Sequence, residues 1–219
     1  MGASPSYLPL ADEPDAERFI DAVLPGVHES GSPFVDWFFG GSAQARSALS
    51  QWMARPSSEA FIRRATLRLV DDQVVGGLIC LPGSEVASCR VADAMAAAKL
   101  AEVRQDVATR LRAAQALFPE VEPTDFYISR MWVSPEHRGW THGLAIVREC
   151  LEAGRRSGFH RVRADTCSTN RGAHGLVKYF GFDFVTESHS EDAAMSYHSW
   201  TKSLDDYRER SWRPRTQRS

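Results

Sequence analysis

The 219-residue sequence lacks the patterns that mark several common classes of protein. Its four cysteines form no CxxC pair and its seven histidines form no HExxH motif, so we expect neither a zinc site nor a thioredoxin-type redox centre. No apolar run reaches the roughly 18 residues of a membrane helix, and residues 1–10 lack the basic start of a signal peptide. We therefore expect a cytoplasmic protein that binds no metal and no membrane.

An excess of charge of one sign is also missing. The formal net charge is −2, and charged residues make up 25% of the chain, as in ordinary soluble domains. No overall field therefore draws the protein to nucleic acid. Five arginines gather in residues 208–218, and we interpret residues 205–219 as a basic tail without a nucleic-acid partner.

The order of the patterns along the chain predicts an α/β (α+β) protein with one domain over residues 16–204. Residues 1–15 contain three prolines and are expected to form a flexible lead. Apolar residues at three- to four-residue intervals predict two helices in 16–54 around an aromatic connector, and a helical insertion over 84–122. Further helices are predicted at 143–157 and 170–179, and strands at 65–70, 74–81, 126–133, 161–166, 182–186 and 194–201.

The segment Val133–Gly143 joins a predicted strand to a predicted helix through a loop that contains glycine. The first amides of a helix have no partner inside it, and together with the helix dipole they favour an anion. Glycine at positions 139 and 143 would let the backbone approach a ligand closely, and Arg138 would add a cationic fork for phosphate oxygens. The residues alone therefore predict an anion site at the start of the helix, which is typical of phosphate binding.

The pattern Val133-x-Pro135-x-x-Arg138-Gly139-x-x-x-Gly143 resembles the acetyl-CoA pyrophosphate loop of the GNAT superfamily of N-acetyltransferases. A second pattern, Asn170-x-x-Ala173-x-x-Leu176, is similar to the superfamily signature after its fifth strand. The resemblance implies a mixed, splayed central β-sheet flanked by helices, with the helical insertion between the third and fourth strands. It also implies acetyl-CoA as co-substrate and an amine as acceptor.

The same resemblance implies which residues bind the co-substrate. Main-chain groups of Met131 and Val133 would pair with the pantetheine arm, the amides from Arg138 to Leu144 would hold the pyrophosphate, and Asn170 would face the pantetheine. The implied set is Met131, Trp132, Val133, Arg138, Gly139, Trp140, Thr141, His142, Gly143, Leu144, Asn170 and Ala173. Thr141 replaces the middle glycine of the usual loop, which makes the approach of a phosphate tighter.

The catalytic groups depart further from the superfamily pattern. The position of its frequent general-acid tyrosine matches Val177, whereas Tyr179 lies two residues, or about 200°, around the helix. Its usual glutamate base on the fourth strand is replaced by Ser129 and Arg130. We therefore place Tyr179 as the nearest candidate acid, expected to face away, with Cys167, Ser168 and His174 as weaker alternatives. Asp125 ranks first as candidate base, and the Val133 amide as the donor to the thioester oxygen.

The acceptor is the part of the reaction that the sequence specifies least. Trp37 and Phe38 are candidate aromatic contacts, and Arg130 would favour a carboxylate or phosphate on the acceptor, unless it forms a structural ion pair. A small-molecule amine, a protein or tRNA amine, and a regulatory CoA-binding module all remain open. A cavity closed by residues 84–122 would oppose a macromolecular acceptor, whereas a flat groove would favour one. The insertion is also compatible with a homodimer contact.

Overall fold

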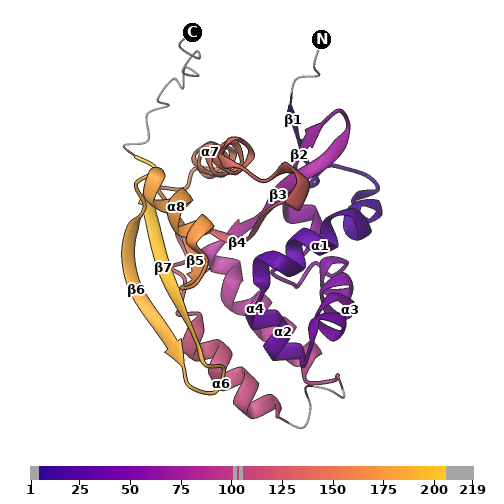
Figure 1. Cartoon of the computed structure of the whole chain (residues 1–219), viewed down its shortest axis with the longest axis vertical. Coiled ribbons are helices and arrows are strands. Elements are labelled where there is room, and N and C mark those ends of the chain that lie inside the picture. Colours follow the sequence, from indigo (N-terminus) through magenta and orange to yellow (C-terminus); the bar gives the residue numbers. More distant parts are fainter. Residues whose placement is uncertain (1–4, 101–102, 104–105, 206–219) are drawn as a thin grey trace.

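A mixed β-sheet between two layers of helices forms the centre of the computed structural model, which describes residues 5–100, 103 and 106–205 (Figure 1). Its seven strands have the order β1-β2-β3-β4-β5-β7-β6, and only the β4–β5 pair is parallel. This arrangement confirms the predicted fold class. The strands are β1 (Ser6–Pro9), β2 (Ala65–Val70), β3 (Gln73–Pro82), β4 (Asp125–Val133), β5 (Arg161–Cys167), β6 (Asp183–Ser190) and β7 (Met195–Ser203).

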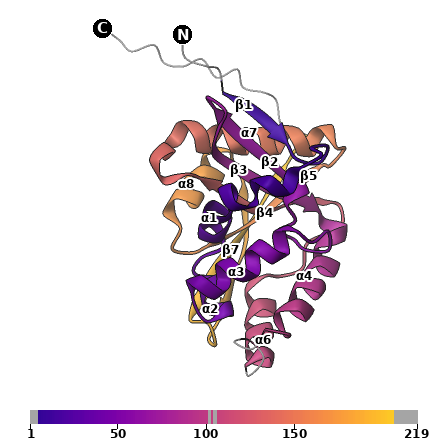
Figure 2. The same ribbon diagram turned by 90° about the vertical axis from the view of Figure 1, so that its right-hand side faces the viewer.

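Two helices cover one face of the sheet, namely α7 (Trp140–Arg156) and α8 (Arg171–Tyr179). The apolar stripe of α7, which includes Ile146, Val147 and Leu151, is buried against strands β3, β4 and β5. Arg155 and Arg156 occupy the last turn of α7, where positive charge complements the helix dipole. This layer lies behind the sheet in Figure 2.

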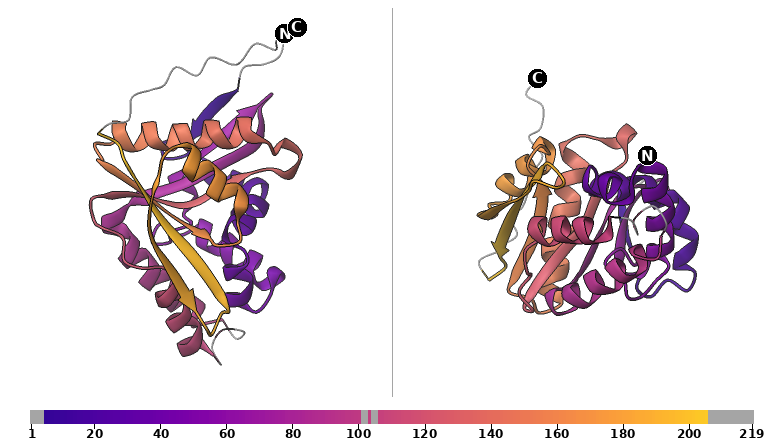
Figure 3. Two further views of the ribbon diagram at one scale, coloured as in Figure 1. Left: turned by 60° about the vertical axis from the view of Figure 1, so that its left-hand side comes forward. Right: turned by 90° about the horizontal axis from the view of Figure 1, so that it is seen from below.

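The opposite face carries the helices that precede and interrupt the central strands (Figures 2 and 3). The short helix η1 (Ala16–Phe19) leads into α1 (Ile20–Gly31), and a second short helix, η2 (Ile62–Arg64), leads into β2. The β6–β7 hairpin is long and reaches the insertion at the end of the molecule, where α6 contacts β6 (Figure 3). The other helices of this layer are α2 (Phe34–Phe39), α3 (Ser42–Met53), α4 (Gly83–Ala97) and α6 (Val107–Leu117).

The helical insertion between β3 and β4 is confirmed, since α4 and α6 lie there. Three details of the predicted organisation are wrong. The predicted lead contains β1, which pairs with β2 through a register that matches Leu8 to Leu67. The aromatic connector is itself the helix α2, and the helix expected from residue 143 begins at Trp140. Of the predicted tail, residues 206–219 lie outside the described residues.

An irregularity in β4 positions the functional site. Arg130 of β4 pairs with Ile79 of β3, but the next residue of β3, Cys80, pairs with Ile128, so that Ser129 is an extra residue in β4. Such a bulge bends a strand and changes which side chains face each side of the sheet. Before the bulge Phe126 and Ile128 face α7, and after it Met131 and Val133 do.

Candidate active site

The sheet opens between β4 and β5 directly at this bulge. The two strands pair only from Asp125↔Arg161 to Ile128↔Ala164, although β4 continues to Val133 and remains paired with β3 on its other edge. Among the described residues, the rest of β4 therefore has no strand on its β5 side. Unpaired backbone groups on a strand edge can accept an extended ligand as an added strand.

The start of α7 has the features of an anion site. Its N-cap is Gly139, at φ 149°, and a Cβ at this position would have no atom within 4 Å. Gly139 provides no side-chain cap, and the first turn of α7 contains no acidic residue. The first amides of this 17-residue helix are thus left for another acceptor, in the field of the positive helix end.

A cavity of about 280 Å³ lies on the other face of the sheet. Its floor comes from β4, β5 and β7, and its walls from α1–α3 on one side and from α4 and α6 on the other. Six of its lining rings form a chain of contacts with centroids 4.8 to 5.4 Å apart. In order of contact these rings are Tyr197, Phe118, Phe34, Phe38, Phe39 and Trp52.

Residues 32–182 match the model of the acetyltransferase (GNAT) family, which is more than half of the chain. The chain belongs to the GNAT family. It is accordingly a GNAT N-acetyltransferase, a member of a family whose typical co-substrate is acetyl-CoA. No protein with a curated description matches the sequence.

Solved structures agree with the GNAT fold at low sequence identity. A Drosophila melanogaster polyamine N-acetyltransferase matches with a TM-score of 0.59 and 13% identity, over 91% of this chain and all of its own. A ribosomal-protein-alanine N-acetyltransferase from Brucella melitensis gives 0.55 and 14%, over 92% and 99%. A putative acetyltransferase from Salmonella typhimurium, solved with its cofactor acetyl-CoA, gives 0.52 and 13%, over 94% and 96%. These likenesses concern the fold and leave the acceptor open.

The geometry of the GNAT loop fits acetyl-CoA, with one change in the role of a glycine. The open N-cap Gly139 and the unpaired edge of β4 at Met131 and Val133 provide donors for a diphosphate and for an extended amide chain. Gly143, however, faces α8, since a Cβ there would lie 3.2 Å from a methyl carbon of Leu176. This glycine therefore allows α7 and α8 to pack closely, which the sequence motif alone did not indicate.

Two of the predicted loop side chains are engaged by other parts of the protein. Arg138 forms an exposed ion pair with Glu29 of α1. The Nδ1 atom of His142 accepts a hydrogen bond of 2.9 Å from Nε of Arg68 in β2. Burial, followed by the charges of Arg68 and His137, lowers the pKa of His142, so its imidazole is neutral and complements the guanidinium. The side chain of Arg68 in turn lies over the ring of Tyr7 in β1, at 5.2 Å.

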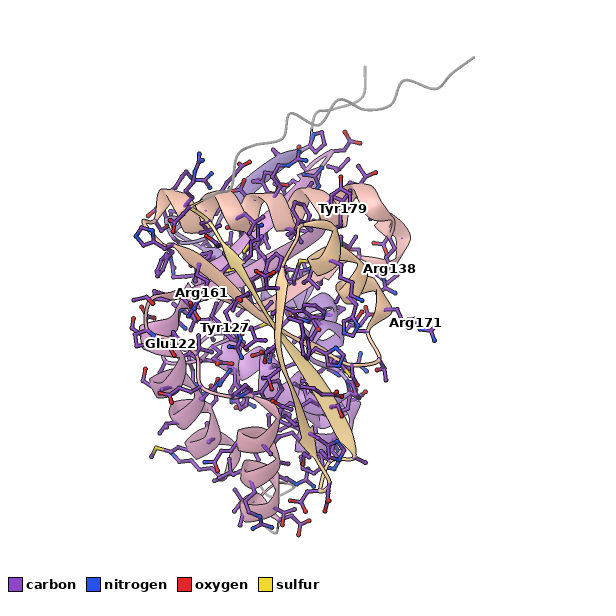
Figure 4. The ribbon with its side chains drawn as sticks, turned by 90° about the vertical axis from the view of Figure 1, so that its left-hand side faces the viewer. Glu122, Tyr127, Arg138, Arg161, Arg171 and Tyr179 are labelled. Carbon is purple, nitrogen blue, oxygen red and sulfur yellow. The ribbon has the colours of Figure 1, made fainter. Side chains whose placement is uncertain are left out.

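The second GNAT signature forms the start of α8. The side-chain oxygen of Asn170 accepts a hydrogen bond of 3.0 Å from the amide of Ala173 and so caps the helix. The contact predicted between Asn170 and pantetheine stays a prediction. Farther along α8, Val177 is buried whereas Tyr179 is 57% exposed, which confirms the predicted helix phase. Figure 4 shows Tyr179 at the outer end of α8, away from Tyr127, so the structure does not bring it to the strand opening.

Asp125 is not placed to act as the base. It lies at the first residue of β4, where β4 and β5 are still paired, and Ser129 is four residues, or about 13 Å, farther along the strand. Its carboxylate is fully buried and accepts a hydrogen bond of 2.5 Å from Nε of Arg161. The parallel register of β4 and β5 brings Arg161, which Figure 4 labels, beside Asp125. This ion pair therefore belongs to the end where the two strands are still paired.

The structure places only some of the predicted acceptor contacts at the cavity. Phe38 and Arg130 line the cavity, whereas Trp37 does not. The ring of Trp37 instead lies 5.7 Å from the guanidinium of Arg110 in α6. The lining also contains polar residues that were not predicted as acceptor contacts, because they become neighbours only in the fold: Glu59, Arg90, Asp93, Tyr127, Ser129, Asp165 and Tyr197.

Each carboxylate in the lining has an arginine partner. Glu59 pairs with Arg90 at 2.9 Å, Asp93 with Arg55 at 2.8 Å, and Asp165 with Arg163 at 3.2 Å. Burial raises the pKa of Asp93 to about 6, despite hydrogen bonds from the Glu59 amide and the Ser58 hydroxyl. The three pairs thus leave little net charge of their own in the cavity.

Two tyrosines of the lining come from the strands β4 and β7. Tyr127 donates a hydrogen bond of 3.1 Å to Asp165 and accepts one of 3.2 Å from Arg90. Tyr197 of β7 pairs with Cys167, the last residue of β5, and therefore lies beside the part of β5 that has separated from β4. Burial is the main cause that raises the pKa of both tyrosines, so both are protonated at neutral pH.

The described residues contain neither a candidate metal site nor a membrane-spanning helix. Residues 5–100, 103 and 106–205 contain no group of three or more histidine, cysteine, aspartate or glutamate side chains that could hold a metal ion. In the same part of the chain, no helix is both long and apolar enough to cross a membrane. All four cysteines are buried as free thiols, with the sulfurs of Cys80 and Cys150 at 3.7 Å.

Proposed function

We propose that this GNAT enzyme transfers the acetyl group of acetyl-CoA to the amine of a small molecule bound in the 280 Å³ cavity. The observation that supports the proposal is the enclosure of that cavity by α4 and α6, which contribute Arg90, Asp93 and Leu111 to its lining. A volume of about 280 Å³ is close to the lower end of the range of pockets that bind small molecules, about 300–1,000 Å³. A folded protein would need an open groove for its terminus or lysine.

The reaction follows from the arrangement on both sides of the strand opening. Acetyl-CoA supplies an activated thioester, and the start of α7 with the free edge of β4 holds its diphosphate and pantetheine. The amine nitrogen bonds to the acetyl carbon, and the carbon–sulfur bond breaks. The amine loses one proton and the CoA thiolate gains one. Holding the two reactants together makes the attack effectively intramolecular, which accounts for a large part of the acceleration in many enzymes.

Tyr197 is the proton donor that we assign to the leaving thiolate. It lies beside Cys167 at the separated end of β5, and its hydroxyl remains protonated because burial raises its pKa. The Val133 amide, at the end of β4, remains our assignment for stabilising the thioester oxygen. Tyr197 thus replaces Tyr179 as the candidate acid, and Asp125 is withdrawn as the candidate base, because neither Asp125 nor Tyr179 lies at the opening.

Filling the cavity tests the proposal. Ala94 of α4 lines the cavity, whereas its neighbour Met95 is 63% exposed. We expect Ala94→Trp to reduce acetylation of small amines at least about 100-fold without changing CoA affinity, and Met95→Trp to change neither. Thiol release from acetyl-CoA is measured with a panel of amines and N-terminal peptides, and CoA affinity by calorimetry. Activity that survives Ala94→Trp, or turnover of peptides alone, would contradict the proposal.

A further inference from the structure

Arg130 and Ser129 line the acceptor cavity, and each has a buried side-chain donor without a partner in the part of the chain that the structure describes. Because Ser129 is the bulged residue of β4, both neighbouring side chains lie in the lining. Among the described residues, Nε of Arg130 and Oγ of Ser129 are buried and make no hydrogen bond. The guanidinium makes one hydrogen bond of 2.7 Å, from Nη1 to the carbonyl of Ser129. Buried donors without partners are rare in native proteins and costly, which points to a ligand that satisfies them.

The charges of the residues that line the cavity indicate that this ligand is an anion. Glu59, Asp93 and Asp165 are each neutralised by an arginine, as described above. Arg130, by contrast, forms no salt bridge within the described part of the chain, so it is the excess charge of the lining. A guanidinium removed from water is costly unless an anion accompanies it. Its planar fork matches the two oxygens of a carboxylate.

Arg130 lies close to the strand opening, so an anion that it binds would lie near the reacting amine. Ser129 is the first residue of β4 beyond the last pair with β5, Ile128↔Ala164, so the bulge lies at the mouth of the strand opening. A carboxylate held there by Arg130 leaves an α-amine, two bonds away, beside the opening. The chain of six aromatic rings provides an apolar wall for the rest of the molecule.

We propose that the acceptor is an α-amino acid with an apolar side chain, whose carboxylate is bound by Arg130 and Ser129. This inference rests on the proposed function and specifies its substrate class. Leaving a buried charged donor unpaired costs about 1.5–3 kcal/mol, or roughly 10- to 150-fold in affinity. The enzyme should therefore discriminate strongly between an amino acid and the amine that lacks its carboxylate.

Two matched series of acceptors test the inference. Leucine, leucinamide and 3-methylbutylamine differ at the carboxylate, and so do phenylalanine, phenylalaninamide and phenethylamine. We expect kcat/KM of the wild-type enzyme to be at least about 30-fold higher for each amino acid than for its amide and its amine. Arg130→Met should abolish this preference, because kcat/KM for each amino acid should fall to the level of its amide and its amine. Arg130→Lys should restore part of the preference, because it restores the charge.

Controls and contrary outcomes separate the inference from the proposed function. Arg130→Met should keep its melting temperature and its affinity for CoA, since Arg130 forms no ion pair among the described residues. Equal rates with amino acid and amine, or a preference that persists in Arg130→Met, would overturn the inference and leave the proposed function intact. A preference for O-phosphoethanolamine over both amino acids would assign Arg130 to a phosphate and also overturn it. Acetylation of none of these amines would overturn both.

Discussion

The indole ring of Trp132 in β4 lies directly against Gly26 of α1. A Cβ at Gly26 would lie 2.1 Å from Cδ1 of the indole, far inside any allowed contact. On its other side, the same ring lies 2.8 Å from the Cβ position of Gly77 in β3. Trp132, which the sequence placed among the residues that bind the co-substrate, thus has a buried side chain that seats α1 on the sheet beside the cavity.

We expect Gly26→Ala to destabilise the protein by about 1–3 kcal/mol, the usual cost of overpacking. Alanine in a helix normally gains up to about 1 kcal/mol over glycine, so the clash must outweigh that gain. Gly172 in α8 is the matched control, because the nearest atom to its Cβ position is 3.6 Å away. Gly172→Ala should be neutral or stabilising. Denaturant unfolding measures both, and equal effects would contradict the contact.

The first turn of α7 provides a test of the diphosphate site. Thr141→Asp places a negative charge there, which should stabilise the helix by roughly 0.3–1 kcal/mol through the dipole. The same charge should repel a diphosphate and weaken CoA binding at least about tenfold, or about 1.4 kcal/mol. Thr141→Asn is the neutral control. Calorimetry with CoA and melting of the free protein measure the two effects, and unchanged affinity in Thr141→Asp would place the diphosphate elsewhere.

The two tyrosines considered as proton donors should respond differently to loss of the hydroxyl. Tyr197→Phe should lower kcat about 100-fold, at the low end of general acid catalysis, while the ring still packs on Phe118. Tyr179→Phe should change kcat less than twofold, because this side chain is exposed. Steady-state rates at saturating acetyl-CoA decide between them. If Tyr179→Phe lowered kcat more than Tyr197→Phe does, the general acid would be Tyr179 of α8.

Asp93 makes the stability of the protein depend on pH. Its pKa in the folded state is about 6, above its ordinary 3.8, because burial disfavours the charged form. The folded state therefore binds the proton more tightly, and stability falls as pH rises from about 4 to about 6. The full loss is about 3 kcal/mol at ~1.4 kcal/mol per pKa unit.

Replacing Asp93 removes this dependence. The unfolding free energy of Asp93→Asn, minus that of the wild type, should increase by about 2 kcal/mol between pH 4.5 and pH 7.5. Comparing each variant with the wild type at the same pH cancels the other titrating groups. Urea unfolding at the two pH values provides the measurement. A difference that stays constant would show that Asp93 has an ordinary pKa in the folded protein.

The sequence correctly predicted the elements whose pattern lies within a short run of consecutive residues. The loop at Arg138–Gly139 and the helix after it were found because a helix start needs small residues and free amides in consecutive positions. The orientation of Val177 and Tyr179 followed from helical geometry alone. The hairpin of β2 and β3 and the helical character of the insertion were likewise indicated by periodicity.

Relationships between distant residues were not predictable in this way. The bulge at Ser129 depends on pairing with β3, and it decides which β4 side chains enter the cavity. Asp125 seemed a free carboxylate because its partner, Arg161, comes beside it only through the parallel register of β4 and β5. Trp37 was grouped with Phe38 as a connector residue, whereas the helical turn of α2 directs the two to different surroundings.

Because β4 and β5 separate, the sheet has an opening that connects its two faces. In the proposed arrangement, the thiol carrier binds at the start of α7, on the side of the sheet that α7 and α8 cover, and the acceptor binds in the cavity on the opposite side. Neither reactant therefore has to leave before the other can bind. Both should therefore be present at once, and we expect double-reciprocal initial-rate plots with intersecting lines. Parallel lines would indicate that the acetyl group is first bonded to the protein and is transferred to the amine only after CoA has left.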